Sequence, residues 1–425
     1  MSLAILLGVF VVGLIIGLPI AVTLALSSIC YLLFVDIPIV VIPQKMFAGI
    51  DVFVLMAIPG FILVGNLMNV GGITQRIIRF ANALVGWIRG GLGLTNVAAS
   101  MLFGGISGTA VADAASIGSV MIPGMKKAGY PADFSAAVTA ASSTVGPIIP
   151  PSLPMIIVGS LSGISVGKMF IAGAIPGILL GLAMMITTYI IAVRRGFGLQ
   201  KWQGFGELAS SFFGAFWALA MTGLILAGLL GGVITPTETA VVASVYACII
   251  GVFFYKELTL KAIPKIMIDS AVSSAAILSL VGFANVFGWI LVSEDIPQMI
   301  AQSILAVTNN KYIIILLINI LLLFIGMFME TIAALIILFV PLMALAVGVG
   351  IDPLHFATFA VLNLMIGLTT PPMGVCLFIY ANIAKISFTS VVRAITPFLV
   401  SNILVLLLVS YIPELSTWLP SVLIK

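Results

Sequence analysis

Charged residues are scarce in this chain of 425 residues, since Asp, Glu, Lys and Arg together make up only 7%. Hydrophobic residues make up 62%, whereas about a quarter of a typical soluble domain is charged. This composition excludes a soluble fold. It predicts an all-α polytopic membrane protein, because a helix satisfies its own backbone groups inside a bilayer.

Reactive side chains are also few. Three cysteines lie far apart in apolar segments, His355 is the single histidine, and no Walker loop or HExxH motif occurs. We therefore expect no disulfide, no metal site built from His and Cys, no enzyme activity, no use of ATP by this chain and no nucleic-acid partner. His355 is expected to be a solvated residue. Because no charged residue precedes Asp36, the N-terminus is expected to be a retained span rather than a cleaved signal.

Two distant stretches of the chain repeat one pattern of glycine, threonine, phenylalanine and proline. The first stretch contains Gly104, Thr109, Pro131, Phe134, Gly146 and Pro150-Pro151. The second contains Gly326, Thr331, Pro353, Phe356, Gly367 and Pro371-Pro372. Paired apolar segments broken by Gly and Pro are typical of substrate sites in secondary transporters. The pattern predicts two inverted repeats, each with a re-entrant helical hairpin and a broken transmembrane helix.

The apolar segments follow the same order in both halves. Hairpins are predicted at 91–125 and 311–348, and broken helices at 131–163 and 353–384. Helices lying in the membrane interface are predicted at 73–90 and 295–308. Residues 3–34 are expected to form two short spans, 3–17 and 19–34, or alternatively one long tilted span.

Lys and Arg in the loops predict which side of the membrane each loop faces. Cytoplasmic loops are predicted at 76–89, 126–127, 194–201, 256–265 and 385–393. Asp36, the 295–311 segment and Asp352 are then outside, so the first hairpin opens inward and the second outward. Both termini are expected outside, unless residues 3–34 form a single span, which would place the N-terminus inside.

Each break in a helix leaves backbone carbonyls and N–H groups without partners in the helix. Unwound carbonyls with nearby hydroxyls can hold Na⁺, and helix N-termini favour an anion. The first sodium site is predicted at Gly104, Gly105, Ser107, Thr144 and Gly146. The second is predicted at Gly326, Thr331, Gly367, Thr370 and Met373. An anionic substrate is expected between them, near Ser107, Thr109, Ser142, Ser143, Thr331 and Thr369. The alternative is that these small residues only pack helices together.

Two acidic residues lie within the predicted hairpins. Acids at membrane depth are rare and often line an ion path or carry a proton. Asp113 and Glu330 are therefore candidates for the ion path. The alternative for each is an acid that caps the start of a hairpin helix.

Four segments of the chain resemble the large membrane subunit of TRAP (tripartite ATP-independent periplasmic) transporters. These segments are FGGISGTAVADAASIGSVMIPGM at 103–125, AASSTVGPIIPPS at 140–152, the run ITPTETA at 234–240 and GLTTPPMGV at 367–375. The resemblance implies sodium-driven uptake of an organic acid anion across a bacterial inner membrane, with two or more Na⁺ ions bound. It also implies two protein partners, a periplasmic substrate-binding protein and a separate small membrane subunit of about four helices.

The same resemblance implies an elevator mechanism, in which a transport domain slides against a scaffold in contact with membrane lipid. The expected scaffold comprises residues 1–90 and 166–310, each with an interfacial arm helix, and a C-terminal span at 385–425. The expected transport domain comprises 91–165 and 311–384. Substrates in the family include sialic acids and C4-dicarboxylates, and the overall sequence of this chain favours sialic acid.

Two other functions stay open on the sequence alone. A stand-alone proton-coupled anion symporter would use Asp113 or Glu330 and would need no binding protein. A channel-like pore, or a scaffold that only anchors partners, would show no saturable uptake dependent on a binding protein.

Overall fold

The computed structural model describes residues 2–424 except 108–109, 232, 297–298, 300–307 and 309, and in those residues the regular secondary structure is entirely helical. Seven of the described helical segments are long and apolar enough to cross a membrane, and several shorter apolar helices accompany them. The predicted all-α polytopic fold is confirmed. The interfacial helix predicted at 295–308 lies largely outside the described residues.

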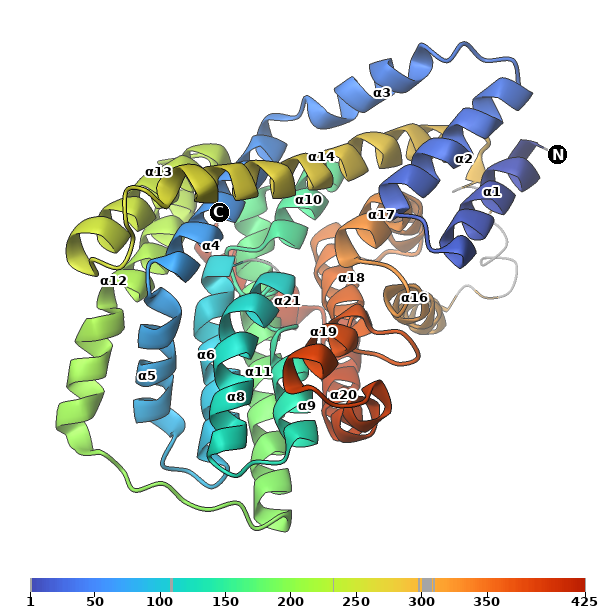
Figure 1. Cartoon of the computed structure of the whole chain (residues 1–425). Helices are drawn as coiled ribbons and strands as arrows, with labels where there is room; N and C mark the ends of the chain where they lie inside the picture. The colour runs from blue at the N-terminus through green and yellow to red at the C-terminus, as the bar shows by residue number, and fades with distance from the viewer. Residues whose placement is uncertain are drawn as a thin grey trace.

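The first helices form a layer along one end of the molecule (Figure 1). Ser2–Ile16 (α1) and Ile20–Phe34 (α2) pack together as two helices, because Gly17 turns the chain with a positive φ of 82° just before Pro19. Val41–Ile50 (α3) follows and lies beside the long helix Ile263–Ser293 (α14). The predicted division of residues 3–34 into two helices is therefore observed.

A second group of helices begins with a 3-10 turn at Phe53–Met56 (η1). It continues with Ala57–Val70 (α4), Ile73–Val85 (α5), Gly204–Leu230 (α12), Pro236–Ile249 (α13) and the π-helical turn Ile250–Phe254 (η3). The apolar face of α5 packs on α12 and on Gly91–Ser107 (α6). Arg76 and Arg79 pair with Glu257 and Glu207. The arginines that predicted an interfacial helix are thus paired with Glu207 of α12 and with Glu257 of the loop before α14.

The first hairpin and broken helix occupy residues 91–163. Gly91–Ser107 (α6) enters, and Ala110–Asp113 (α7), the π-helical turn Ala114–Gly118 (η2) and Ser119–Lys127 (α8) return. The crossing helix is split into Ala132–Ser142 (α9) and Leu153–Ser162 (α10), and the long helix Val166–Arg194 (α11) follows.

The second hairpin and broken helix repeat this order. Lys311–Gly326 (α16) and Thr331–Gly348 (α17) form the hairpin, and Pro353–Gly367 (α18) and Val375–Ala384 (α19) form the split helix. Phe388–Tyr411 (α20) and Glu414–Leu423 (α21) complete the chain. Both breaks therefore occur where the glycine and proline pattern predicts them, although the inverted relation of the halves stays a prediction.

Three basic loops lie at the same end of the molecule (Figure 1). They join α5 to α6, α8 to α9 and α11 to α12. Arg89 and Arg195 lie in these loops, and Lys126, Lys127 and Arg194 lie in the last turns of the helices that lead into them. The α3 and α14 helices lie toward the opposite end. Which side of the membrane these loops face stays a prediction.

Candidate functional site

Each hairpin touches the broken helix that follows it through a pair of glycines. A Cβ atom added at Gly146 would lie 3.1 Å from the Cα of Gly104, and one added at Gly367 would lie 2.7 Å from the Cα of Gly326. Only a residue without a Cβ allows two backbones to approach this closely. The structure thus brings together the glycines predicted for each sodium site.

The first break removes the regular hydrogen-bond pattern between α9 and α10. Residues 143–148 form turns, and Ser152 starts α10 by accepting a hydrogen bond from the backbone N–H of Met155 at 3.3 Å. Thr144 is fully buried, and its hydroxyl donates to the Ala141 carbonyl at 2.8 Å. Gly105 and Ser107 lie at the end of α6, whereas Thr109 lies outside the described residues.

The second break joins α18 to α19 and also touches the tip of the second hairpin. The backbone N–H of Gly374 donates to the carbonyl of Met327 at 3.0 Å. Thr369 and Thr370 both donate their hydroxyls to the Ile366 carbonyl, at 3.0 and 2.8 Å. Met373 is 51% exposed, so its side chain turns outward while Thr331 is buried against α18.

The two acids of the hairpins have different surroundings. Glu330 caps α17, because its carboxylate accepts from the backbone N–H groups of Ile332 at 2.8 Å and Ala333 at 3.3 Å. Asp113 is only 1% exposed, and its Oδ2 lies 2.7 Å from where a Cβ of Gly146 would be. The Glu330 carboxylate is therefore a helix cap, whereas the Asp113 carboxylate lies directly against the first break.

Buried asparagines fix the first hairpin arm to the broken helix in each half. In the first half the Asn96 amide donates to the Thr139 hydroxyl at 2.5 Å, and Ser142 bonds to both Asn96 and Ser100. In the second half the Asn363 amide donates to Oδ1 of Asn319 at 2.8 Å. We call these two sets of hydrogen bonds, which join α6 to α9 and α16 to α18, the two arm seams. Ser142 was predicted to contact substrate, but its hydrogen-bond partners Asn96 and Ser100 were not predicted. The signal in the sequence was Asn96 itself, a polar amide inside an apolar segment.

The two halves also meet each other. Helix α19 packs on α9 and η2, where a Cβ on Gly118 would lie 2.8 Å from the ring of Tyr380. Ser143 at the first break lies beside Cys376 and Tyr380. The Lys126 ammonium donates to the carbonyl of Ala384 at 2.8 Å, at the C-terminal end of α19. Ser143, predicted to contact substrate, thus lies at the junction of both halves.

His355 is buried rather than solvated, which corrects the expectation from the sequence. It is 1% exposed, and its Nδ1 lies 2.8 Å from the Ser416 hydroxyl while Nε2 lies 3.0 Å from the Ser410 carbonyl. Its position in the sequence suggested an exposed helix start. The corner between α20 and α21 folds over that start, and such a contact between distant segments leaves no local signal.

No group of three or more His, Cys, Asp or Glu side chains that could hold a metal ion is found in the part of the chain that the structure describes. The oxygen donors near the two breaks are backbone carbonyls, hydroxyls and single carboxylates. Such donors suit a hard monovalent cation held at broken helices.

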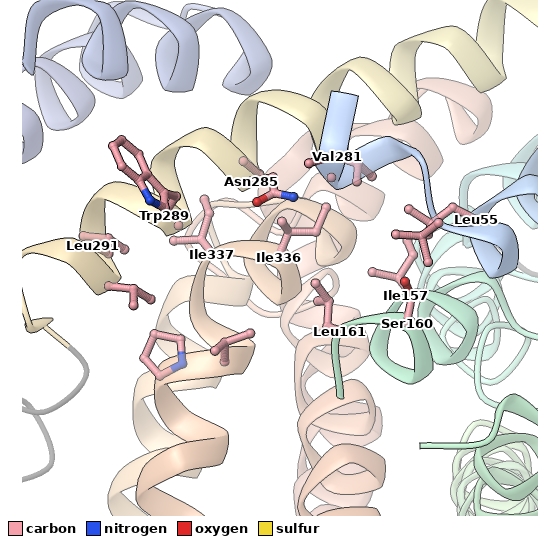
Figure 2. Close-up of a pocket in the computed structure, with 18 residues that line it drawn as sticks. Leu55, Ile157, Ser160, Leu161, Val281, Asn285, Trp289, Leu291, Ile336 and Ile337 are labelled. Atoms are coloured by element: carbon pink, nitrogen blue, oxygen red, sulfur yellow. The ribbon is translucent and has the colours of Figure 1, made fainter. Parts of the chain in front are cut away.

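A cavity of about 400 Å³ lies apart from the two breaks (Figure 2). It is enclosed by α3 and α14 on one side and by α10 and α17 on the other. Among the described residues, none of those predicted for ion or substrate binding lines this cavity. It therefore separates the expected scaffold helices from helices of both expected transport halves.

Comparison with known proteins gives one consistent family. Residues 7–415 match the family described as tripartite ATP-independent periplasmic transporter, DctM component. The sialic acid TRAP transporter large permease protein SiaM of Vibrio cholerae is 42% identical, covering 95% of each chain. The C4-dicarboxylate TRAP transporter large permease protein DctM of the same organism is 37% identical, covering 98% of this chain and 97% of that one.

Two further comparisons concern another relative and the fold. The isethionate TRAP transporter permease protein DctMQ of Oleidesulfovibrio alaskensis is 38% identical over 97% of this chain and 65% of its own length. Among solved structures, the Alcanivorax borkumensis YdaH transporter is similar in fold, with a TM-score of 0.62 and 16% identity, covering 87% of this chain and 86% of that one.

Proposed function

Because this chain belongs to the DctM component family of the tripartite ATP-independent periplasmic transporters, we propose that it takes up an organic acid anion in symport with Na⁺. It is a membrane permease subunit of the bacterial inner membrane. The proposed uptake is secondary and active, with at least two sodium ions bound per cycle and no catalytic chemistry by this chain.

The observation that carries the sodium proposal is the pair of glycine contacts at the two breaks. At Gly104 with Gly146, and at Gly326 with Gly367, a hairpin and an interrupted helix approach backbone to backbone. Buried hydroxyls of Thr144 and Thr370 lie on the turns that follow α9 and α18. Carbonyls at such turns can replace the hydration shell of Na⁺, and the ion stabilises the turns in return.

The substrate proposal draws on the relatives. These relatives are named as transporters of sialic acid, C4-dicarboxylates and isethionate, all of which are anions at neutral pH. We place sialic acid first, because the sialic acid permease is similar over nearly the whole of both chains. The substrate would lie between the two breaks, where Ser143 of the first half lies beside Tyr380 of the second.

The proposed mechanism is an elevator. Residues 91–165 and 311–384 would move as one body, since α19 packs on α9 and η2. The remaining helices would form the scaffold and contact lipid. A periplasmic binding protein would deliver the substrate, and a small membrane subunit would brace the scaffold.

Uptake by the reconstituted complex tests the coupling. With binding protein and sialic acid supplied outside the vesicles, replacing external Na⁺ by K⁺ at constant pH should abolish uptake. Uptake that continues unchanged in K⁺ would refute sodium coupling. Uptake that needs no binding protein would refute the tripartite arrangement.

A second candidate is proton coupling, favoured by one observation, the position of the Asp113 carboxylate against Gly146. A proton-coupled carrier would lose pH-driven uptake in Asp113→Asn and keep uptake in K⁺. Glu330→Gln tests the other acid in the same way. Because Glu330 caps α17, its loss is expected to lower stability as well.

A further inference from the structure

The cavity between α3, α14, α10 and α17 contains polar groups that the protein itself does not use. Asn285, Trp289 and Ser160 line it, and Figure 2 shows the Asn285 amide directed into the space among apolar side chains. Within the described part of the chain, none of these three side chains has a hydrogen-bond partner. All three residues are partly exposed, so water or a ligand in the cavity can satisfy their polar groups.

A cation stacks on one of the residues that line this cavity. The ammonium of Lys45 lies 5.0 Å from the centre of the Trp289 ring. Lys45 precedes the cavity residues Ala48 and Gly49 by about one helical turn on α3, so these residues share one face of the helix. A ligand in the cavity would therefore meet an amide, an indole N–H, a hydroxyl and one positive charge.

The shape and composition match those of a small-molecule site. Such sites have volumes of roughly 300–1,000 Å³, mostly apolar walls and a few convergent polar groups. A lipid chain would fill the apolar walls but would leave the amide and hydroxyl unsatisfied. A small hydroxylated carboxylate would satisfy them and would pair its charge with Lys45.

We propose that this cavity is a second binding site for the transported carboxylate, on the side of the molecule opposite the basic loops. Asn285, Ser160 and Trp289 would bind its polar groups and Lys45 its carboxylate. This inference rests on the proposed function and deepens it, since it adds an intermediate binding site for the substrate between the outer surface and the two breaks. The helices around it come from the scaffold and from both transport halves, so movement of the transport halves would reshape the site.

The test compares uptake by reconstituted complexes that carry Asn285→Leu, Lys45→Gln or no substitution. Leucine keeps the branched shape of asparagine but cannot form hydrogen bonds. Losing one hydrogen bond to a charged ligand weakens binding about tenfold. We expect each variant to raise the sialic acid concentration for half-maximal uptake about tenfold. The sodium concentration for half-maximal uptake at saturating substrate should stay within about twofold.

A matched control and a direct measurement keep this result interpretable. Asn382→Leu makes the same change at an exposed asparagine of α19 and should leave uptake unchanged. Adding sialic acid to the purified complex should change its tryptophan fluorescence, and Trp289→Phe should remove that change.

Three outcomes would overturn the proposal while leaving sodium-coupled uptake intact. The first is normal half-saturation in both Asn285→Leu and Lys45→Gln. The second is a fluorescence change that persists in Trp289→Phe. The third is a response of these variants only to the phospholipid composition of the vesicles, which would identify a lipid as the occupant. Loss of sodium dependence in the unsubstituted complex would instead refute the proposed function.

Discussion

At the scale of single residues, the glycines at the breaks have no room for a side chain. A Cβ on Gly367 would lie 2.7 Å from the Cα and 2.8 Å from the carbonyl carbon of Gly326. Both contacts are with backbone atoms, which cannot move aside as a flexible side chain can. The glycine positions therefore control how closely a hairpin and a broken helix approach.

Gly367→Ala is expected to destabilise the protein by about 1–3 kcal/mol, the usual effect of overpacking. It should also raise the sodium concentration for half-maximal uptake, because α16 and α18 must separate. Thermal unfolding in detergent and sodium titration of uptake would measure the two effects. Gly124→Ala is the control, because a Cβ there meets no atom within 4 Å. An equal loss of stability in both variants would contradict the contact argument.

Thr370→Ala is expected to weaken sodium binding, whereas Thr370→Ser should behave like the unsubstituted protein. The hydroxyl now donates to the Ile366 carbonyl at 2.8 Å, which leaves its lone pairs available to a cation. The half-saturating sodium concentration should rise several-fold in the alanine variant. Thr109→Ala is expected to have the same effect. Unchanged sodium dependence in both alanine variants would show that our sites are misplaced.

At the scale of helices, the arm seams hold the first arm of each hairpin to the crossing helix. The Asn363 amide donates to both the side-chain and the backbone carbonyl oxygen of Asn319, at 2.8 and 2.9 Å. Asn363 is fully buried and Asn319 is 4% exposed. The seam therefore sets the spacing of α16 and α18 above the second break.

Asn363→Leu is expected to lower the free energy of unfolding by about 1–3 kcal/mol, because it removes the amide that donates to two buried oxygens of Asn319 and leaves only the longer Ser410 hydrogen bond, at 3.4 Å, to Oδ1. Adding Asn319→Leu should cost less than the sum of the two single changes. Thermal or denaturant unfolding of the four proteins measures this coupling. Strict additivity would mean that the two amides do not stabilise each other.

The sequence predicts the elements of this fold better than their contacts. Glycine, proline and long apolar runs predict the hairpins and both breaks, because these signals are local to the chain. The burial of His355 under α21, the pairing of Asn319 with Asn363 and the cavity beside Asn285 arise from segments far apart in the sequence. The glycine pairs were predicted only in part. The repeated spacing predicted that each hairpin glycine would face the glycine of the broken helix, but it did not predict how close their backbones would be.

At the scale of the whole molecule, an elevator requires α10 and α17 to slide past α3 and α14. Val52 and Ser160 both line the cavity between these groups. Cysteines at these two positions, joined by a flexible cleavable cross-linker, should stop uptake, and cleavage should restore it. Cysteines at Asn66 and Ser270, whose side chains lie 2.8 Å apart within the expected scaffold, are the control pair. Full uptake in the cross-linked test pair would argue against sliding.

The packing of α19 on η2 and α9 has a consequence for how the carrier responds to salt. Under the proposed function, a sodium ion bound at one break would also order the surface on which the other half packs, and the first ion would therefore favour binding of the second. The uptake curve would then rise sigmoidally with sodium, with a Hill coefficient above one. The uptake rate would then be low at low external sodium concentrations and would rise steeply over a narrow range of sodium concentration.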